Sequence, residues 1–271
     1  MQELTPEPVI SVRDLVVSYG GRRVLNGINL DITRGETMTL LGGSGSGKST
    51  LLRHIIGLEQ PQAGRILVNG VDLATSSQKD LKRVRRSIGV AFQNPALFNS
   101  MSVEDNAALP LREHTQLAES TIKLMTWMKL MVVGLAEFGD HRPRELSGGM
   151  QKRAAIARAL ALDPEILVFD EPSAGLDPIV AAELDELILG LKRAFSMTIL
   201  VVTHEMASAF RIADRMAMLY QGSLIEVGSK EKLRSSTHPR IRQFFDRVPD
   251  EVLNAAIIDG YFERYLKEGV Q

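Results

Sequence analysis

The chain has 271 residues, of which 44% are hydrophobic, so it can bury the core of one large or two modest domains. Its formal net charge of −1 gives no reason to expect wholesale binding to nucleic acid or to an anionic membrane surface. The lack of cysteine excludes disulfides and thiolate metal sites and fits a reducing compartment. Neither a secretory signal nor a run of about 18 apolar residues is recognisable, so we expect a cytoplasmic protein without a membrane span.

The N-terminal part of the chain favours β-strands. Two segments alternate apolar and polar residues around a turn at Gly20-Gly21, which is typical of an antiparallel layer of half-buried strands. Asn69-Gly70 is a further hairpin signal. The predicted strands in this part are 9–18, 27–32, 37–41, 65–68 and 88–92.

Between residue 95 and about residue 145 the strand pattern stops and helical spacing replaces it, notably at 103–109 and 117–133. Together with the helix that follows, this block predicts a helical subdomain over about 95–160, inserted within an α/β domain. Several large side chains on its second helix are expected to be core or partner-helix contacts rather than a ligand site. They are Met125, Trp127, Met128 and Met131.

Strands and helices then alternate, which favours a mostly parallel sheet wrapped by helices. We expect one α/β domain over 1–239. The apolar residues of 240–271 are too few for a domain and predict an extension that docks on this chain or on another. The predicted elements are strands 166–169, 198–203, 216–220 and 223–227, and helices 178–194 and 206–212.

A glycine-rich loop after the strand at 37–41 matches the pattern G-x-x-x-x-G-K-[ST] and leads into a helix-like stretch. Its glycines free the main chain to surround a polyphosphate, and the following helix presents its positive end. Lys48 is expected to reach the outer phosphates and Ser49 to ligate Mg²⁺. A flexible glycine-serine linker would not explain a lysine at this offset, so the loop predicts binding of a nucleoside triphosphate. The loop residues are Gly42, Gly43, Ser44, Gly45, Ser46, Gly47, Lys48, Ser49 and Thr50.

An acidic pair ends the apolar strand at 166–169. A phosphate-loop ATPase needs a carboxylate at a strand end to hold Mg²⁺, and Asp170 occupies that position. Glu171 follows directly and is placed to polarise an attacking water. An acid pair alone can simply end a strand, but together with the phosphate loop it predicts a hydrolytic centre.

A second glycine-rich turn, Ser147-Gly148-Gly149, also precedes a helix. We therefore expect it to bind an anion at the helix N-terminus, as the phosphate loop does. With the leucine before it, this turn resembles the LSGGQ-like signature of the ATP-binding cassette (ABC) family, which lies just upstream of the metal-binding strand. The resemblance extends to about residue 230 and includes further positions in the order of the family. They are Tyr19 before the first turn, Gln93 after a strand, Asp177 after the acid pair and His204 at a strand end.

The resemblance implies an α/β P-loop NTPase fold of the ABC type, with an antiparallel β subdomain, that hydrolyses ATP with Mg²⁺. It implies that Tyr19 stacks on adenine, that Gln93 lies near Mg²⁺ and the attacking water, and that His204 contacts the γ-phosphate. The second glycine-rich turn would contact the nucleotide of another subunit, with Asp177 at the seam between the subunits. Hydrolysis would therefore need a head-to-tail homodimer.

Two features need a separate interpretation. Met150 stands where most members of the family have glutamine, which removes a polar side chain next to the predicted nucleotide contact. A basic cluster could suggest nucleic acid, but no aromatic residue interleaves with it, so we interpret it as the solvated face of a helix. The cluster comprises Lys79, Lys82, Arg83, Arg85 and Arg86.

Within the family, segments 105–115 and 238–245 and the Ser-Ala-Gly-Leu-Asp-Pro seam loop resemble the ATPase subunits of Mla/Mce-type lipid transporters. The resemblance implies a permease, an MCE-domain lipid-binding protein and a STAS-domain protein as partners, and a peripheral location on the inner membrane. The implied task is to power phospholipid movement between the inner and outer membranes. We expect the permease contact near 93–101, where Leu97 and Phe98 offer an apolar surface.

Two alternatives stay open. An ATPase subunit of a transporter for another solute would share every catalytic residue and differ only in its permease. A soluble cassette ATPase that acts in DNA repair or on the ribosome would carry a coiled-coil insertion, a zinc insertion or a second cassette. The sequence contains none of these three features.

Overall fold

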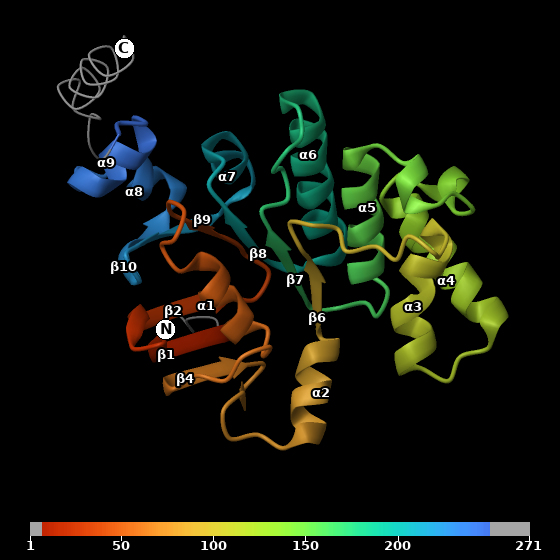
Figure 1. The fold of residues 1–271 in the computed structure, drawn as a ribbon, viewed down its shortest axis with the longest axis horizontal. Helices are drawn as coiled ribbons and strands as arrows, with labels where there is room; N and C mark the ends of the chain where they lie inside the picture. The colour runs from red at the N-terminus through yellow and green to blue at the C-terminus, as the bar shows by residue number, and fades with distance from the viewer. Residues whose placement is uncertain (1–6, 250–271) are drawn as a thin grey trace, which may run out of the picture. The chain divides into compact units, whose positions relative to one another are not determined.

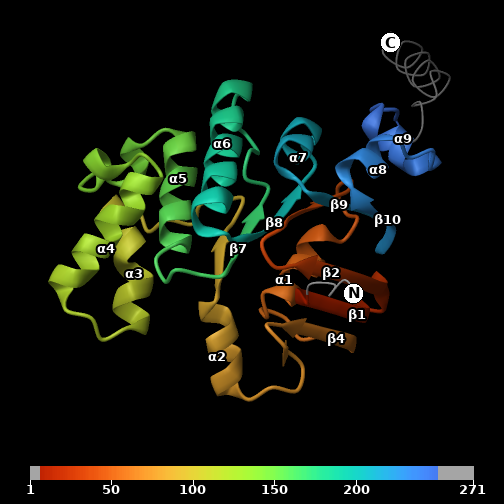
Figure 2. The same cartoon turned by 180° about the vertical axis from the view of Figure 1, so that it is seen from behind.

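The structure is a computed structural model that describes residues 7–249. Its contacts divide the chain into two compact units, Met1–Ser235 and Ser236–Gln271. The first unit contains both sheets and helices α1 to α8, which Figures 1 and 2 show from opposite sides. In the second unit, helix α9 (Pro239–Phe245) begins at a cap formed by the His238 side chain. The domain limits set from the sequence stay predictions, and residues 250–271 of the expected docking extension lie outside the described residues.

A four-stranded antiparallel sheet forms one layer of the first unit, with strand order β2-β1-β4-β5. Alternate residues near the end of β2 are buried, in line with the predicted period of two. The turns predicted at Gly20-Gly21 and Asn69-Gly70 are both present and have positive φ angles. The strands are β1 (Pro8–Tyr19), β2 (Arg22–Thr33), β4 (Ala63–Val68) and β5 (Val71–Asp72).

The second sheet has six strands in the order β10-β9-β3-β8-β7-β6 and is the predicted core sheet. Neighbouring strands from β9 to β6 run parallel, whereas β10 pairs antiparallel with β9. Both β3 and β8 are buried along their whole length, as expected for parallel strands covered on both faces. The strands are β3 (Thr37–Leu41), β6 (Ile88–Ala91), β7 (Ile166–Asp170), β8 (Thr198–Thr203), β9 (Arg215–Tyr220) and β10 (Ser223–Ser229).

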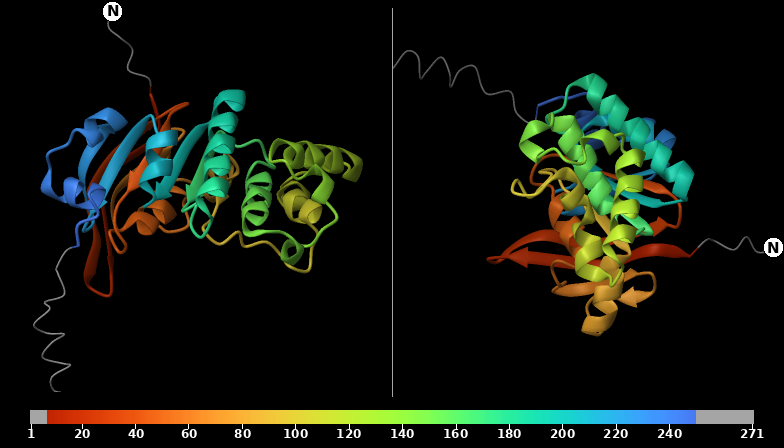
Figure 3. Two further views of the ribbon diagram at one scale, coloured as in Figure 1. Left: turned by 90° about the horizontal axis from the view of Figure 1, so that it is seen from above. Right: turned by 90° about the vertical axis from the view of Figure 1, so that its right-hand side faces the viewer.

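Side-chain caps begin several of the helices. Ser77, Ser102, Ser147, Asp177 and Ser229 each accept a hydrogen bond from a main-chain N–H of the first turn. Helices α3, α4 and α5 pack against one another away from the antiparallel sheet, which confirms the predicted helical insertion (Figures 1 and 3). The helices are α1 (Lys48–Ile55), α2 (Gln78–Arg86), α3 (Val103–His114), α4 (Glu119–Val132), α5 (Gly148–Ala159), α6 (Pro178–Phe195), α7 (Met206–Ile212) and α8 (Lys230–Arg234), with 3₁₀ turns at Ala136–Phe138 and Pro143–Glu145.

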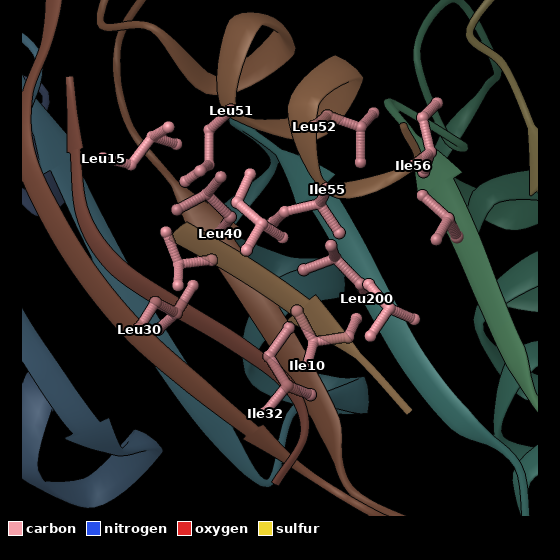
Figure 4. Packing of buried hydrophobic residues seen from close by; sticks show 14 of the residues in the cluster. Ile10, Leu15, Leu30, Ile32, Leu40, Leu51, Leu52, Ile55, Ile56 and Leu200 are labelled. Carbon is pink, nitrogen blue, oxygen red and sulfur yellow. The ribbon is translucent and has the colours of Figure 1, made fainter. Parts of the chain in front are cut away.

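Hydrophobic clusters cover both faces of the core sheet. On one face, Leu51 and Ile55 of α1 belong to one buried cluster with Leu15 of β1 and Leu40 of β3 (Figure 4). All four side chains are fully buried, and each such burial contributes about 1.5–3 kcal/mol before the entropy of ordering is counted. On the other face, Phe169 of β7 packs among residues of α5 and α6. The ends of β3 and β7, where the predicted site begins, are therefore held between two packed layers.

The large side chains of α4 divide between core and surface. Met125 packs against a small cluster with α3, but Trp127, Met128 and Met131 are each about half exposed. These three side chains are therefore not in the core of the chain. Of the two roles expected from the sequence, core packing and contact with a partner helix, the second remains for them. In residues 7–249 we find no helix whose length and apolarity would let it cross a membrane.

Candidate nucleotide site

The phosphate loop leaves β3 and enters α1 through a backbone that favours glycine. Gly47, the N-cap of α1, has a φ of 107°, and a Cβ there would lie 2.8 Å from Leu25 Cδ2 and 3.1 Å from the Val24 carbonyl oxygen. A side chain at this position would therefore push the loop away from β2. No side chain caps α1, so its first N–H groups are available to an anion.

Lys48 points back into this loop. Its Nζ donates hydrogen bonds to the carbonyl oxygens of Gly42 at 2.7 Å and Gly43 at 3.0 Å, and the residue is only 8% exposed. Burial lowers the pKa of Lys48, while the negative charges of Glu171 and Asp170 act in the opposite direction. The structure therefore brings the predicted phosphate-binding lysine next to the predicted acid pair. Its main-chain acceptors can be exchanged for phosphate oxygens.

The main chain turns sharply where β7 ends. Glu171 has a φ of 49°, in the left-handed region, and its N–H donates to the carbonyl oxygen of Val202 on β8 at 2.8 Å. This conformation costs a non-glycine residue roughly 1–2 kcal/mol, so it persists only because the surrounding sheet holds it. Strain of this kind is common at functional sites and marks Glu171 as a residue held for its position.

The carboxylate of Glu171 is fixed by His204, which follows β8. The Nδ1 atom of His204 lies 2.8 Å from Oε2 of Glu171, and its main-chain N–H donates to the same oxygen at 3.3 Å. The carboxylate is buried, whereas the imidazole is about half exposed. Two of the predicted catalytic residues therefore meet in the free chain, and about half of the histidine side chain remains exposed.

Buried side-chain oxygens of this region lack hydrogen-bond partners within residues 7–249. They belong to Ser46 of the phosphate loop, to Asp170 and to Ser173. Burial, and then the negative charge of Glu171, raise the pKa of Asp170. An unpartnered buried carboxylate oxygen is costly, and a hard cation with oxygen ligands, such as Mg²⁺, would satisfy it. The chemistry of these donors fits the predicted metal, although Ser49, another predicted ligand, lies exposed in the first turn of α1.

The signature turn begins α5. Ser147 is the N-cap of this helix, and its Oγ accepts a hydrogen bond from the N–H of Met150 at 3.3 Å. Gly149 lies so close to α6 that a Cβ there would be 2.6 Å from Cγ1 of Val180. Asp177 caps α6 by accepting hydrogen bonds of 3.0 and 3.1 Å from its first turn. The predicted signature and the predicted seam residue are therefore neighbours within one chain.

The signature and the phosphate loop of one chain do not meet. Helices α1 and α5 lie on opposite sides of β7 in both views of the ribbon (Figures 1 and 2). Among the described residues, no hydrogen bond links Ser147 or Gly149 to the loop that contains Lys48. One chain thus carries two separate parts of the predicted ATP site.

Tyr19 and Gln93 come from different sheets of the fold. Tyr19 ends β1, and its hydroxyl donates to the Glu59 carboxylate, which raises the pKa of the phenol. Thr50 of the phosphate loop also interacts with this hydroxyl, so Tyr19 lies beside the loop. Gln93 is exposed in the loop after β6, and within the described part of the chain no hydrogen bond joins it to the acid pair.

Sequence motifs do not single out two basic side chains of α5 that contact this region. Lys152 donates through Nζ to the carbonyl oxygen of Glu171 at 3.3 Å. Arg158 donates to the carbonyl oxygens of Pro95 at 2.6 Å and Ala96 at 2.8 Å. All three acceptors are main-chain atoms, which every residue has, so no side-chain pattern marks these contacts.

The remaining polar clusters of the sequence have structural explanations. His54 is buried, with Nδ1 2.8 Å from the Thr50 carbonyl oxygen, and the basic cluster lies on α2 opposite the buried Leu81 and Val84. Across residues 7–249, no group of three or more His, Cys, Asp or Glu side chains is arranged to hold a metal ion.

A phosphate loop between β3 and α1, beside a strand that ends in an acid pair, is the arrangement of P-loop nucleotide-binding proteins. The family model described as "ABC transporter" matches residues 25–174. The chain belongs to this family and is an ABC ATPase, which binds and hydrolyses ATP. The family, the fold class and the ATPase activity expected from the sequence are confirmed.

Curated relatives cover most of the chain. It is 46% identical over 239 residues to the "probable ribonucleotide transport ATP-binding protein mkl" of Mycobacterium leprae, a match that covers 88% of this chain and 68% of the relative. It is 41% identical over 242 residues to the "intermembrane phospholipid transport system ATP-binding protein MlaF" of Escherichia coli, with coverage of 89% and 90%.

Solved structures agree with this assignment. CbiO1 of Clostridium perfringens, part of an ABC transporter complex, has a TM-score of 0.79 and 32% identity, over 90% of this chain and 96% of its own. The ATP-binding cassette MJ0796, solved as a dimer in a post-hydrolysis state with ADP and Pi, has a TM-score of 0.74 and 29% identity, over 81% of this chain and 98% of its own.

Proposed function

We propose that the chain is the nucleotide-binding subunit of a transporter that moves phospholipid between the inner and outer membranes, through a complex with an MCE-domain protein. The observation that carries this proposal is the match to MlaF, which covers 89% of this chain and 90% of MlaF. CbiO1 matches over a similar span, but its identity to this chain is 32% against 41% for MlaF, and this higher identity over nearly the whole of both chains supports a shared place in a complex.

In the proposed reaction, ATP binds along the phosphate loop. The ammonium of Lys48 exchanges the carbonyl oxygens of Gly42 and Gly43 for phosphate oxygens, while the N–H groups of the loop surround the polyphosphate. Tyr19 stacks on the adenine, and its hydrogen bond to Glu59 holds the ring in one orientation. These contacts bind and orient ATP before any bond is broken.

Asp170, Ser49 and Gln93 are the residues that would hold Mg²⁺. The unpartnered buried oxygen of Asp170 supports this assignment. When bound, Mg²⁺ supplies positive charge that neutralises the phosphate oxygens during transfer. Gln93 is exposed in the loop after β6 and is the third proposed ligand.

Glu171 is the proposed general base. Its carboxylate would accept the proton of a water as that water attacks the γ-phosphorus of ATP. Because His204 occupies Oε2 of Glu171, the other carboxylate oxygen is left for the water. The half-exposed imidazole of His204 is then the group proposed to contact the γ-phosphate and to fix the water.

A head-to-tail homodimer would complete each site. Because α1 and α5 lie on opposite sides of β7, a two-fold arrangement can bring the signature of one chain to the phosphate loop of the other. Each ATP would then lie between Lys48 of one chain and the partner's signature turn, with Asp177 at the seam. The dimeric state of the MJ0796 cassette supports this arrangement. The signature residues involved are Ser147, Gly148 and Gly149.

The proposed permease contact lies next to the loop of Gln93. Phe98 is 52% exposed there, whereas Leu97 packs partly against the core. A cavity of about 690 Å³ beside Phe92 has a largely basic lining from α2, which supports docking of a permease segment with acidic groups. Its basic lining residues on α2 are Lys82, Arg85 and Arg86, and Glu113 of α3 also lines it.

In this proposal the chain lies on the cytoplasmic face of the inner membrane, bound to the permease. An MCE-domain protein and a STAS-domain protein are the further partners. We test the proposal by purifying the complex from native membranes through a tag on this chain and reconstituting it in liposomes with a fluorescent phospholipid. We expect a permease and an MCE-domain protein in the complex, and ATP-dependent phospholipid transfer that the matched E171Q complex lacks. A complex without an MCE-domain protein that transfers no phospholipid would contradict it.

A second candidate is transport of ribonucleotides or another solute. The mycobacterial mkl relative supports it, because its identity of 46% exceeds the 41% of MlaF, although this chain covers only 68% of that relative. The same reconstituted complex separates the two candidates. ATP-dependent uptake of a radiolabelled ribonucleotide, without phospholipid transfer, would favour the second.

A further inference from the structure

We infer that Arg158 is a positioning residue for ATP hydrolysis, which holds the loop of Gln93 to the signature helix α5. The guanidinium donates through Nη2 to the Pro95 carbonyl oxygen at 2.6 Å and through Nη1 to the Ala96 carbonyl oxygen at 2.8 Å. Two donors of one planar group thus bind two consecutive carbonyl oxygens, and the fixed spacing of these donors holds the two peptide planes more rigidly than the rotatable ammonium of a lysine would. The inference rests on the role proposed above for Gln93.

The two carbonyls gripped by Arg158 control the conformation of Ala96. The Pro95 carbonyl belongs to the peptide plane before Ala96, and the Ala96 carbonyl belongs to the plane after it. Fixing both planes fixes φ and ψ of the residue between them. Ala96 has a φ of 48°, in the left-handed region that residues with a side chain seldom adopt. Such strain persists only where the surroundings over-determine the backbone, and Arg158 supplies that constraint together with Asn94, whose Oδ1 accepts a hydrogen bond from the Ala96 N–H at 3.1 Å.

The hydrogen bonds of the Arg158 side chain go to these two carbonyl oxygens. The side chain is partly buried, and this burial lowers the pKa of the guanidinium. Among the described residues it forms no ion pair, and Pro95 and Ala96 are its hydrogen-bond acceptors. Keeping a cation partly buried for main-chain acceptors is costly, so the contact does more than solvate a surface arginine.

The same loop is anchored a second time by α3. Asn106 is fully buried, accepts a hydrogen bond from the Phe98 N–H at 2.7 Å and donates to the Phe98 carbonyl oxygen at 3.1 Å. On its other side, Gln93 is separated from β6 only by Phe92. Gln93 therefore lies at the join between a strand and a loop held by helices, so its position depends on where Arg158 fixes the residues that follow it.

Helix α5 also contacts the residue proposed as the general base. Lys152 donates to the Glu171 carbonyl oxygen at 3.3 Å, and it lies about 9 Å along the helix axis from Arg158. One helix thus contacts the main chain of Glu171 near its middle and the Gln93 loop near its C-terminal end. Loss of the Arg158 contacts would free Gln93 to move relative to Glu171, which should slow hydrolysis more than it weakens ATP binding.

The test compares R158Q, R158K and R153Q in the full-length chain. For R158Q we expect kcat to fall by about ten- to a hundredfold, because a misplaced group of the reacting centre costs that much. The KM and the ATP affinity should stay within about twofold of the wild type. R158K, with one ammonium for two carbonyls, should recover only part of kcat. R153Q is the matched control: it removes an ion pair with Glu183 from the same helix and should keep the wild-type kcat.

A double-mutant cycle decides how Arg158 acts. If it acts through Gln93, the Q93A/R158Q variant should have the kcat of Q93A alone within about twofold. Losses that multiply, with Q93A itself slow, would overturn this inference and leave the role of Gln93 standing. Q93A at the wild-type rate would overturn both. If R158Q does not fold, judged by its thermal unfolding, the same cycle with R158K gives the decision.

Discussion

The imidazole and the main chain of His204 hold one oxygen of Glu171: Nδ1 lies 2.8 Å and the main-chain N 3.3 Å from Oε2. The two residues follow adjacent parallel strands, β8 and β7, whose register sets the distance between them. The buried carboxylate of Glu171 is therefore oriented in the free chain, before ATP arrives. A group oriented in advance costs no reorganisation when charge develops in the transition state.

Replacing Glu171 by glutamine should separate ATP binding from turnover. The amide of E171Q keeps the shape of the side chain and a hydrogen-bond acceptor, but it does not accept a proton from water. We expect kcat to fall by about 10²- to 10⁴-fold with ATP affinity unchanged, measured as phosphate release and nucleotide binding. ATP-stabilised dimers should accumulate in light scattering. K48A is the comparison, because it removes a charge paired with phosphate and should weaken both steps. An E171Q rate near that of the wild type would rule out Glu171 as the base.

The proposed sharing of each ATP between two chains predicts rescue between two inactive variants. A mixture of S147R chains and K48A chains contains heterodimers with one intact site, made from Lys48 of one chain and Ser147 of the other. We expect ATPase activity above that of either variant alone. The heterodimers are isolated through two different tags, and each variant mixed with itself serves as the control. Isolated heterodimers that bind ATP without hydrolysing it would contradict a model in which one intact site is sufficient.

The close contact between Gly149 of the signature helix and Val180 of α6 predicts that the effect of G149A on the free energy of unfolding depends on the residue at position 180. In G149A the new Cβ would lie 2.6 Å from Cγ1 of Val180, and overpacking of this kind typically costs about 1–3 kcal/mol. In the V180A background the obstacle is gone, and alanine is the better helix former by about 1 kcal/mol. We therefore expect G149A to lower the free energy of urea unfolding in the wild type and to leave it unchanged or raised in V180A. Equal losses in both backgrounds would show that Val180 is not the cause.

Helices and strands that are long enough to show a full pattern of apolar residues can be predicted from the sequence. The strand predicted at 198–203 and the helix predicted at 206–212 have the bounds of β8 and α7 in the structure. The strand β8 is a continuous run of buried residues, and α7 buries residues at helical spacing, so both have a pattern that can be recognised in the sequence. The short β5 and α8 are not predicted, because two and five residues hold too little periodicity to be recognised.

The candidate site likewise has parts that the sequence predicts and parts that it does not. The phosphate loop, the acid pair and His204 follow β3, β7 and β8, which are neighbours in the parallel sheet, so their meeting follows from the predicted topology. The contacts of Arg158 and Lys152 could not be predicted, since their acceptors are main-chain carbonyls placed by loop conformation. The exposed position of Gln93 likewise depends on how the helical insertion holds its loop.

Asp185 makes the stability of the fold depend on pH through a carboxyl outside the site. It is 4% exposed, on α6. Burial raises its pKa above the ordinary 3.8, Ser208 and Arg211 act in the opposite direction, and Glu186 adds to the rise. A carboxyl whose pKa is higher in the folded state binds its proton more tightly there. Its contribution to stability is therefore fully present below pH 3.8 and is lost as the pH rises through the raised pKa.

The variant D185N keeps the shape of the side chain and cannot ionise, so it should escape this loss. We expect its free energy of unfolding, relative to the wild type, to increase as the pH rises through the window and to become constant above it, as measured by urea titrations at a series of pH values. S208A removes a hydrogen bond that holds the pKa of Asp185 down, so in that background the window should extend to higher pH. A difference between D185N and the wild type that stays the same at every pH would mean that folding leaves the pKa of Asp185 unchanged, and the prediction would be wrong.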